Sequence, residues 1–412
     1  ELRTFDAWHL ELGGVADAFS ETPAFVAFLS RHAGETGPLL TAHFTGNFGP
    51  AEYGGDPGEL TRACPNVQRA VVDAFDRHIP EGYEVGVECT HHGPTDVGVP
   101  SLFVELGSSE SEWTDPEGAR AVARSVLELG GTRPDATPDG NEAGDDVDHD
   151  RTRQIVGFGG GHYAPQFERI LRETDWRIGH VAADWGLASM GAPESNADLL
   201  ATAFEQSAAT RAVVARDDPD LETIVEELGY RVVDETWLRE TTGVDIALVA
   251  ALEAELRPID DGLRLGAPAA AADAPDPGSV DVVSLPDDLL AEASGISQEQ
   301  TVAAVRERVV AFETVEGGTK PRGRAAVTDP DAVDGVVDGL VTILDKKYRT
   351  VARDADRIVA SRRTFDPAAA ADIGVPEGPA FGRLAAGEVV EVDGRTIEPE
   401  AVHTQETVTF QI

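Results

Sequence analysis

The stretch QIVGFGGGHYAPQFERILRETDWRIGHVA, residues 154–182, decides the fold class. Apolar runs at 154–158 and 177–182 predict two buried strands, and the segment 164–174 between them has the apolar spacing of a helix. A strand, a helix and a second strand joined by short connections are typical of an α/β sheet that is parallel or mixed.

The same alternation extends in both directions from this stretch. Apolar runs at 24–29, 83–89 and 211–214 predict further strands, and helical spacing recurs at 65–79, 115–129 and 194–207. We therefore expect an α/β domain over residues 1–255, with a mixed central sheet and flanking helices. The segment 132–150 lacks periodicity and predicts an exposed acidic loop.

Composition changes after this first domain. Residues 256–286 are rich in Ala, Pro and Asp, and predict an acidic linker. Residues 287–412 predict a C-terminal α+β extension, with a hairpin that turns at Asp393-Gly394. The domain boundary is placed at the linker.

The charge of the chain is extreme. Lys and Arg number 33 against 75 Asp and Glu, so the net charge is −42. Such self-repulsion destabilises a compact state, but at about 1 M salt the Debye length is roughly 3 Å. Because the excess is spread along the chain, it favours adaptation to molar salt over the alternative, a binder of basic partners. Basic residues cluster at 320–324 and 346–349, which are candidates for phosphate contacts.

Cysteine content and hydropathy bear on location. Two cysteines, Cys64 and Cys89, argue against a disulfide scaffold and favour a reducing cytoplasm. Because no 18-residue apolar run and no secretory signal are visible, we expect a cytoplasmic protein without a membrane span.

Three segments rich in His and Gly follow predicted strands, at 30–49, 88–96 and 157–165. Ligands of open α/β sheets bind outside the carboxyl ends of strands, so one pocket could collect all three segments. Successive side chains of a strand point to opposite faces, so only one of His91 and His92 should face the pocket unless the backbone turns. The glycines 159–161 precede a helix and could present amides to an anion.

These segments supply the candidate site residues. The catalytic candidates are His91, His92, His162 and Glu88. The candidates for substrate binding are Gly159, Gly160, Gly161, Thr45 and Asn47. The candidate metal ligands are His32, His43, Glu105, His91 and His162.

Several chemistries remain open at this point. Neutral imidazoles and carboxylates are zinc ligands in hydrolases, where an open position holds water. A histidine could instead act as a general base on water without metal. Cys89, beside two histidines, is a possible nucleophile. The G-x-S-x-G elbow is absent, and the glycine run does not fit the G-x-G-x-x-G dinucleotide fingerprint.

The segments resemble those of a known family. SRHAGETGPLLTAHFTGNFG (30–49), ECTHHGPTDVG (88–98), PSLFVELGSSESEW (100–113) and GFGGGHYAPQF (157–167) are similar to the hallmark segments of archaeal and plant D-aminoacyl-tRNA deacylases. The likeness covers about residues 1–255. It implies a fold similar to phosphorylases and peptidyl-tRNA hydrolases, and hydrolysis of the ester between a D-amino acid and tRNA. It also implies zinc, with two ions as one possibility, and we expect a monomer.

The resemblance has two departures. The chain starts inside the family pattern, so we expect this domain to lack its N-terminal strand. The tail GPAFGRLAAGEVVEVDGRTIEP (378–399) resembles a C-terminal segment of metallo-β-lactamase-type tRNA 3′-end nucleases, but their H-x-H-x-D-H motif is absent, so no nuclease activity is expected. The competing functions are a phosphorylase or nucleosidase acting on small nucleosides, and a non-catalytic tRNA-binding protein.

Overall fold

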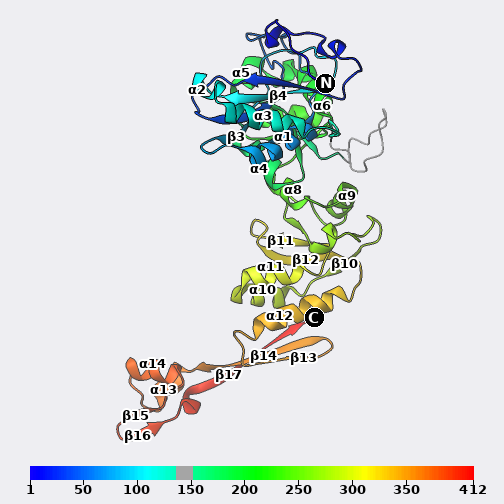
Figure 1. Cartoon of the computed structure of the whole chain (residues 1–412). Coiled ribbons are helices and arrows are strands. Elements are labelled where there is room, and N and C mark those ends of the chain that lie inside the picture. The colour runs from blue at the N-terminus through cyan, green and yellow to red at the C-terminus, as the bar shows by residue number, and fades with distance from the viewer. Residues whose placement is uncertain (136–151) are drawn as a thin grey trace. The chain divides into compact units, whose positions relative to one another are not determined.

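The chain forms several sheets flanked by helices, which confirms the mixed α/β class (Figure 1). The computed structural model describes residues 1–135 and 152–412, so most of the acidic loop expected at 132–150 lies outside the described residues. The internal packing divides the chain into two units, Glu1–Ile246 and Ala247–Ile412. Among the described residues, none of the helices combines the length and apolar character that a membrane span needs.

The first sheet of the N-terminal unit has the strand order β1-β4-β2-β3. Its strands are β1 (Val26–Arg31), β2 (Leu39–His43), β3 (Glu84–Val87) and β4 (Ser101–Gly107). The β1/β4 and β2/β3 pairs are parallel, whereas β2 and β4 are antiparallel. Helices α1 (Pro65–His78) and α3 (Pro116–Leu127) pack beside it, and the short α2 (Glu110–Trp113) follows β4. The periodic residues Val67, Val71 and Phe75 of α1 are buried, as their spacing predicts.

The second sheet contains the stretch that decided the fold class. It has the order β6-β5-β7-β8 and is parallel throughout. Its strands are β5 (Gln154–Phe158), β6 (Arg177–Ala182), β7 (Arg211–Val214) and β8 (Arg231–Val232), and its helices are α4 (Pro165–Glu173), α5 (Asp184–Met190), α6 (Ala197–Ser207) and α7 (Pro219–Glu227). The strand–helix–strand unit predicted over 154–182 is therefore confirmed.

The expectation of one central sheet is wrong, because these are two separate four-stranded sheets. They meet at the segment that follows β3, where Glu88 forms an isolated bridge with Tyr163. The N–H of Cys89 donates to the carbonyl of His162, and the N–H of Thr90 donates to that of Val181. Strand periodicity alone does not reveal where a hydrogen-bond ladder stops.

The C-terminal unit begins with helical turns and a four-stranded antiparallel sheet. Helix α8 (Glu235–Glu240) still belongs to the N-terminal unit, and α9 (Ile246–Glu255) precedes the sheet, whose order is β10-β12-β11-β9. The strands are β9 (Leu263–Leu265), β10 (Asp281–Ser284), β11 (Ala311–Val315) and β12 (Lys320–Val327), and the helices α10 (Asp287–Ile296), α11 (Gln298–Arg306) and α12 (Ala332–Leu344) share an apolar core with it. Residues 256–286, expected as a linker, thus include β9 and β10. The overall composition of this segment obscured two short strands, one of which buries Leu263 and Leu265.

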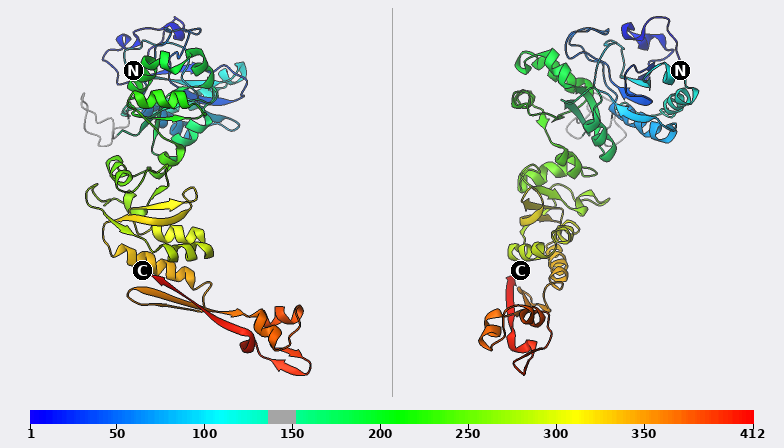
Figure 2. Two further views of the ribbon diagram at one scale, coloured as in Figure 1. Left: turned by 180° about the vertical axis from the view of Figure 1, so that it is seen from behind. Right: turned by 90° about the vertical axis from the view of Figure 1, so that its left-hand side faces the viewer.

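A long antiparallel arm forms the rest of this unit. Strands β13 (Thr350–Arg353) and β14 (Arg357–Phe365) form a hairpin. β14 continues beside β17 (His403–Gln411) to a small module, as two views show (Figure 2). That module contains α13 (Pro367–Asp372), α14 (Pro379–Ala385), β15 (Val390–Val392) and β16 (Arg395–Ile397). The predicted hairpin is confirmed: Asp393 and Gly394 turn with φ of 49° and 75°.

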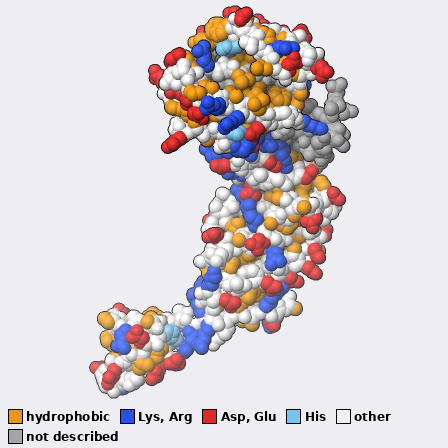
Figure 3. Space-filling view, in the orientation of Figure 1, with side chains coloured by type: hydrophobic (Ala, Val, Ile, Leu, Met, Phe, Trp, Pro, Cys, Tyr) orange, Lys and Arg blue, Asp and Glu red, His pale blue; other side chains and the backbone are white. Residues whose placement is uncertain are grey.

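Acidic side chains are scattered over the visible surface of both units (Figure 3). This distribution agrees with an excess of acid that runs along the whole chain. Many arginines are paired locally, as Arg353 is with Asp334 and Asp338.

Candidate active site

Seven of the sequence-predicted residues converge where strands of the first sheet meet the turn after β5. His32 follows β1, His43 ends β2 and Glu105 lies within β4. The segment after β3 contributes Glu88, His91 and His92, and the glycine turn after β5 contributes His162. These residues form overlapping groups whose ligand atoms lie within 4.8 Å of one another.

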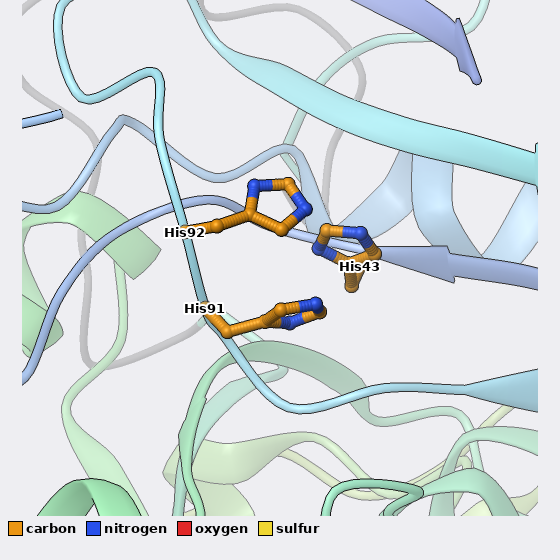
Figure 4. Close-up of side chains that lie close together, drawn as sticks. All are labelled: His43, His91 and His92. Atoms are coloured by element: carbon orange, nitrogen blue, oxygen red, sulfur yellow. The ribbon is translucent and has the colours of Figure 1, made fainter. Parts of the chain in front are cut away.

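Three of the histidines face one another (Figure 4). The ring centroid of His43 lies 4.3 Å from that of His91 and 4.9 Å from that of His92, and the rings of His91 and His92 are 4.4 Å apart. His43 is fully buried, and the other two are partly buried. These three histidines form a group that could hold a metal ion.

Hydrogen bonds decide which nitrogen of each ring is free. The Nδ1 of His43 lies 3.0 Å from the carbonyl oxygen of Phe44, that of His91 lies 2.8 Å from Cys89 O, and that of His92 lies 2.6 Å from Gly93 O. A carbonyl only accepts, so each Nδ1 carries a hydrogen, and a ring in its neutral form keeps its lone pair on Nε2. Such backbone contacts fix the tautomer and orientation of metal-binding histidines.

The backbone at His92 explains how two adjacent histidines reach the same place. An extended chain would send His91 and His92 to opposite sides. His92 instead has a φ of 46°, in the left-handed region, so the chain turns between them. The condition stated for the sequence prediction is therefore met, and both rings join the cluster.

Glu88 connects the two halves of the cluster. Its Oε2 accepts a 2.7 Å hydrogen bond from Nε2 of His162 and lies 3.7 Å from Nε2 of His91. Its Oε1 lies 3.2 Å from Nδ1 of His32, outside hydrogen-bond geometry, and is buried without a hydrogen-bond partner. The Nε2 of His43 is a second buried atom without a hydrogen-bond partner. Unsatisfied buried polar atoms are costly, and a bound ion or water at the cluster would satisfy both of these.

Burial and neighbouring charges set the protonation of these groups. Burial would raise the pKa of Glu88, but His162 and His32 hold that pKa well below its usual range. Burial would lower the pKa of His32, but Glu105 and Glu88 raise it to about 11. Burial, together with His43, lowers the pKa of His92 to about 3. Glu105 and Glu88 also raise the pKa of the buried His43. The cluster therefore combines ionised carboxylates with a protonated His32 and a neutral His92.

Burial and the charge of His43 also lower the pKa of His91 well below its usual range. Glu105 lies 3.6 Å from Nδ1 of His32 and 3.8 Å from Nε2 of His43. Burial alone would raise its pKa, but the adjacent His32 and His43 lower it. Glu105 is thus an ionised carboxylate directly beside a candidate nitrogen donor.

The cluster opens into a cavity of about 320 Å³. His91, His92 and His162 line it together with Asn47 and several aromatic residues. The Nδ2 of Asn47 donates to the carbonyls of Gly54 and Asp56, at 3.0 and 3.2 Å, and so orders the loop at the rim.

Other residues predicted to bind substrate lie elsewhere. Thr45 is buried, and its hydroxyl lies 3.2 Å from that of Thr61. The N–H of Gly159 donates to the carbonyl of Ala182, so it is engaged within the fold. Gly159 and Gly160 have φ of 103° and 86°, and the turn that they form with Gly161 leads the chain into His162.

Sequence reasoning missed several neighbours of the cluster. The hydroxyl of Tyr163 lies 2.8 Å from Nε2 of His32, and the indole N–H of Trp113 donates to the carbonyl of His32. Trp185 and Tyr53 line the cavity. Tyr163 and Trp113 belonged to quoted segments, but an aromatic residue carries no spacing signal of its own.

Cys89 is a poor candidate for a nucleophile. It is fully buried, and burial and the charge of Glu88 raise the pKa of its thiol to about 12. Its sulfur lies 3.9 Å from Nδ1 of His162. A reactive cysteine needs an environment that lowers the pKa, which is the opposite of this one.

Comparison with known proteins gives consistent matches. The family model of D-aminoacyl-tRNA deacylase matches residues 19–233. A protein named D-aminoacyl-tRNA deacylase from Haloquadratum walsbyi is 49% identical, over 100% of this chain and 88% of its own length. Those of Halorubrum lacusprofundi and Methanoregula boonei are 50% and 33% identical, over 100% and 92% of this chain and 87% and 82% of their own lengths. A crystal structure of a conserved protein of unknown function is 26% identical, with a TM-score of 0.48, and covers 57% of this chain and 80% of its own.

Proposed function

The chain belongs to the D-aminoacyl-tRNA deacylase family, and from this premise we propose that it hydrolyses the ester bond of D-aminoacyl-tRNA at the cluster around Glu88. The products are the free D-amino acid and tRNA. The observation that carries the proposal is the convergence of His43, His91, His92 and His162 on one buried carboxylate beside a cavity.

The donor set fits a zinc ion. His43, His91 and His92 would hold it through Nε2, because each Nδ1 is engaged with a backbone carbonyl. Glu105 lies close enough to His43 to support that ring. A second group, of His32, Glu88 and His162, could hold another ion only in place of the hydrogen bond between Glu88 and His162. Bound zinc would polarise the ester carbonyl and lower the pKa of a bound water to about 7.

Glu88 and His162 supply the proton transfer in this proposal. The carboxylate accepts from Nε2 of His162, so the neutral ring keeps its lone pair on Nδ1. The ring can then accept a proton from the attacking water and return it to the leaving ribose oxygen. Glu88 fixes the tautomer and stabilises the imidazolium that forms, as a buried carboxylate does in other catalytic pairs.

The fold and location complete the proposal. A resemblance to phosphorylases and peptidyl-tRNA hydrolases remains our expectation for the first unit, on the mixed α/β arrangement of its sheets. A tRNA ester as substrate agrees with the expected cytoplasmic location, and a monomer remains our expectation. The family matches favour ester hydrolysis over phosphorolysis. The basic clusters are weaker phosphate candidates than their sequence suggested, since Lys320 pairs with Glu316 and Arg324 with Glu313.

The test is deacylation of D-tyrosyl-tRNA against L-tyrosyl-tRNA in molar KCl with added zinc. We expect the D-ester to be hydrolysed and the L-ester to be spared. His162→Ala should abolish turnover, whereas His78→Ala, on α1 and paired with Glu128, should not change it. Hydrolysis of neither ester by the unaltered chain, or full activity of His162→Ala, would contradict the proposal.

A further inference from the structure

A large aromatic side chain stands half exposed at the cavity that contains the histidines. Trp185 is 49% exposed, although tryptophan usually buries most of its surface. It is the second residue of α5 and lines the cavity together with His91, His92 and His162. Tyr53, also exposed, lines the same cavity. Exposed rings beside reactive groups indicate a surface for a flat ligand.

The position of Trp185 is fixed from several sides. Its side chain lies close enough to Cys89, the residue after Glu88, to lower the pKa of that thiol against the larger effect of burial. Its carbonyl accepts from the hydroxyl of Ser189 at 2.8 Å. Helix α5 lies so close to the loop below it that a Cβ on Gly49 would come 2.8 Å from the Cβ of Ser189. The indole is therefore held at the cavity, which a stacking surface requires.

The charge of the chain removes the usual source of affinity for tRNA. With a net charge of −42, the protein as a whole repels phosphates. In molar salt, phosphate contacts also contribute little, because counterion release weakens as salt rises. Stacking of a base on an aromatic ring does not depend on net charge. An acidic tRNA-binding protein is thus expected to hold the end of its substrate by stacking.

We propose that Trp185 is the stacking platform for the terminal adenine of tRNA, the nucleoside that carries the ester. The proposal rests on the deacylase function, since the amino acid is esterified to the ribose of that adenosine. When the ester lies at the histidine cluster, its adenine must lie within one nucleoside length. Trp185 lines the same cavity as His91, His92 and His162. Trp185 acts in binding and takes no part in proton transfer.

The experiment measures adenosine and ribose as inhibitors of D-tyrosyl-tRNA hydrolysis, in the full chain and in four variants. We expect adenosine to inhibit the unaltered protein more strongly than ribose, and Trp185→Ala to weaken inhibition by adenosine about 5- to 150-fold. Trp185→Phe should keep most of the preference for adenosine. Trp8→Ala is the matched control, because Trp8 is an exposed tryptophan that lines a different cavity. Tyr53→Ala tests the other exposed ring.

Each outcome decides the assignment. Equal inhibition of the unaltered protein by adenosine and ribose, undetectable inhibition by adenosine, or an unchanged preference in Trp185→Ala overturns it. Loss of the preference in Tyr53→Ala but not in Trp185→Ala also overturns it. A structural role for Trp185 would instead reduce kcat and leave the ratio of the two inhibition constants unchanged. If the unaltered chain does not hydrolyse D-tyrosyl-tRNA, the proposed function itself fails. This result is obtained before any variant is compared.

Discussion

Replacing His92 with asparagine isolates the contribution of one nitrogen donor to metal binding. His92 has a φ of 46°, and asparagine is among the few residues that adopt this conformation readily. The shorter side chain cannot reach the position of the His92 Nε2, so the set of three donors loses one member. Because His92 is only partly buried, the substitution should leave the fold in place.

The magnitude follows from linkage between binding and folding. Zinc at 100 times its Kd stabilises the native state by about 2.7 kcal/mol. For a unit the size of Glu1–Ile246, each kcal/mol shifts Tm by about 2–4 °C, so zinc should raise Tm by roughly 5–11 °C. Removing even a residue that only hydrogen-bonds to a metal ligand lowers metal affinity roughly 10- to 100-fold. A loss of about 100-fold leaves a stabilisation of roughly 0.4 kcal/mol, which is a shift of about 1 °C.

The assay is thermal unfolding of metal-stripped protein in molar KCl, with and without added zinc. His78→Asn serves as the matched control, because His78 is a histidine on α1 that pairs with Glu128 away from the cluster. It should keep the full zinc-dependent shift. A full shift in His92→Asn would refute the assignment of His92 as a donor, and no shift in the unaltered protein would refute the metal site itself.

Three further substitutions test other parts of the structure. Glu88→Gln should reduce kcat about 10²- to 10⁴-fold, because a neutral amide no longer stabilises an imidazolium at His162. The circular dichroism spectrum should stay unchanged. A smaller loss of kcat would show that Glu88 takes no part in the proton transfer. Thr45→Val should lower the free energy of unfolding in urea by about 1 kcal/mol, since the buried hydroxyl faces Thr61. It should leave kcat/KM unchanged, and a loss of activity would instead show that Thr45 contacts the substrate. Phe204→Ala should lower the free energy of unfolding by about 3–5 kcal/mol in the same assay, because the ring is fully buried and its centroid stacks 3.8 Å from that of Tyr230. A decrease below about 1 kcal/mol would contradict this packing.

Sequence periodicity captured most elements of the first unit, but it missed β2 and α5 and did not reveal how the strands pair. The strands at 154–158 and 177–182 and the helix between them formed because their apolar spacing matches the periods of strand and helix. The break between the two sheets depends on hydrogen bonds made by Glu88, Cys89 and Thr90 to residues far along the chain. Such long-range pairing leaves no periodic signal. The strands β9 and β10 were missed because they are only three and four residues long within a segment rich in Ala, Pro and Asp.

The candidate site was predictable in composition, but its geometry was not. His and Gly segments at three strand ends predicted that one region would collect histidines. The inclusion of both His91 and His92 depended on a positive φ at His92, which is unusual for a residue other than glycine and could not be predicted from the sequence. Thr45 stood beside chemically suggestive neighbours, yet its side chain points into the core. The aromatic residues Trp185 and Tyr53 became candidates once the cavity placed them beside the histidines.

The acidic surface and the buried cluster have different consequences for a protein in molar salt. Exposed charges are screened over roughly 3 Å at 1 M salt, whereas buried charges are screened much less. Glu88 and Glu105 are nearly inaccessible, so their effect on the surrounding histidines should persist at salt concentrations that weaken surface ion pairs. Contacts between the protein and the phosphates of tRNA lie at the surface, so salt screens them. Electrostatic catalysis is therefore expected to reside in the buried cluster, while binding relies on contacts, such as stacking on Trp185, that salt does not screen.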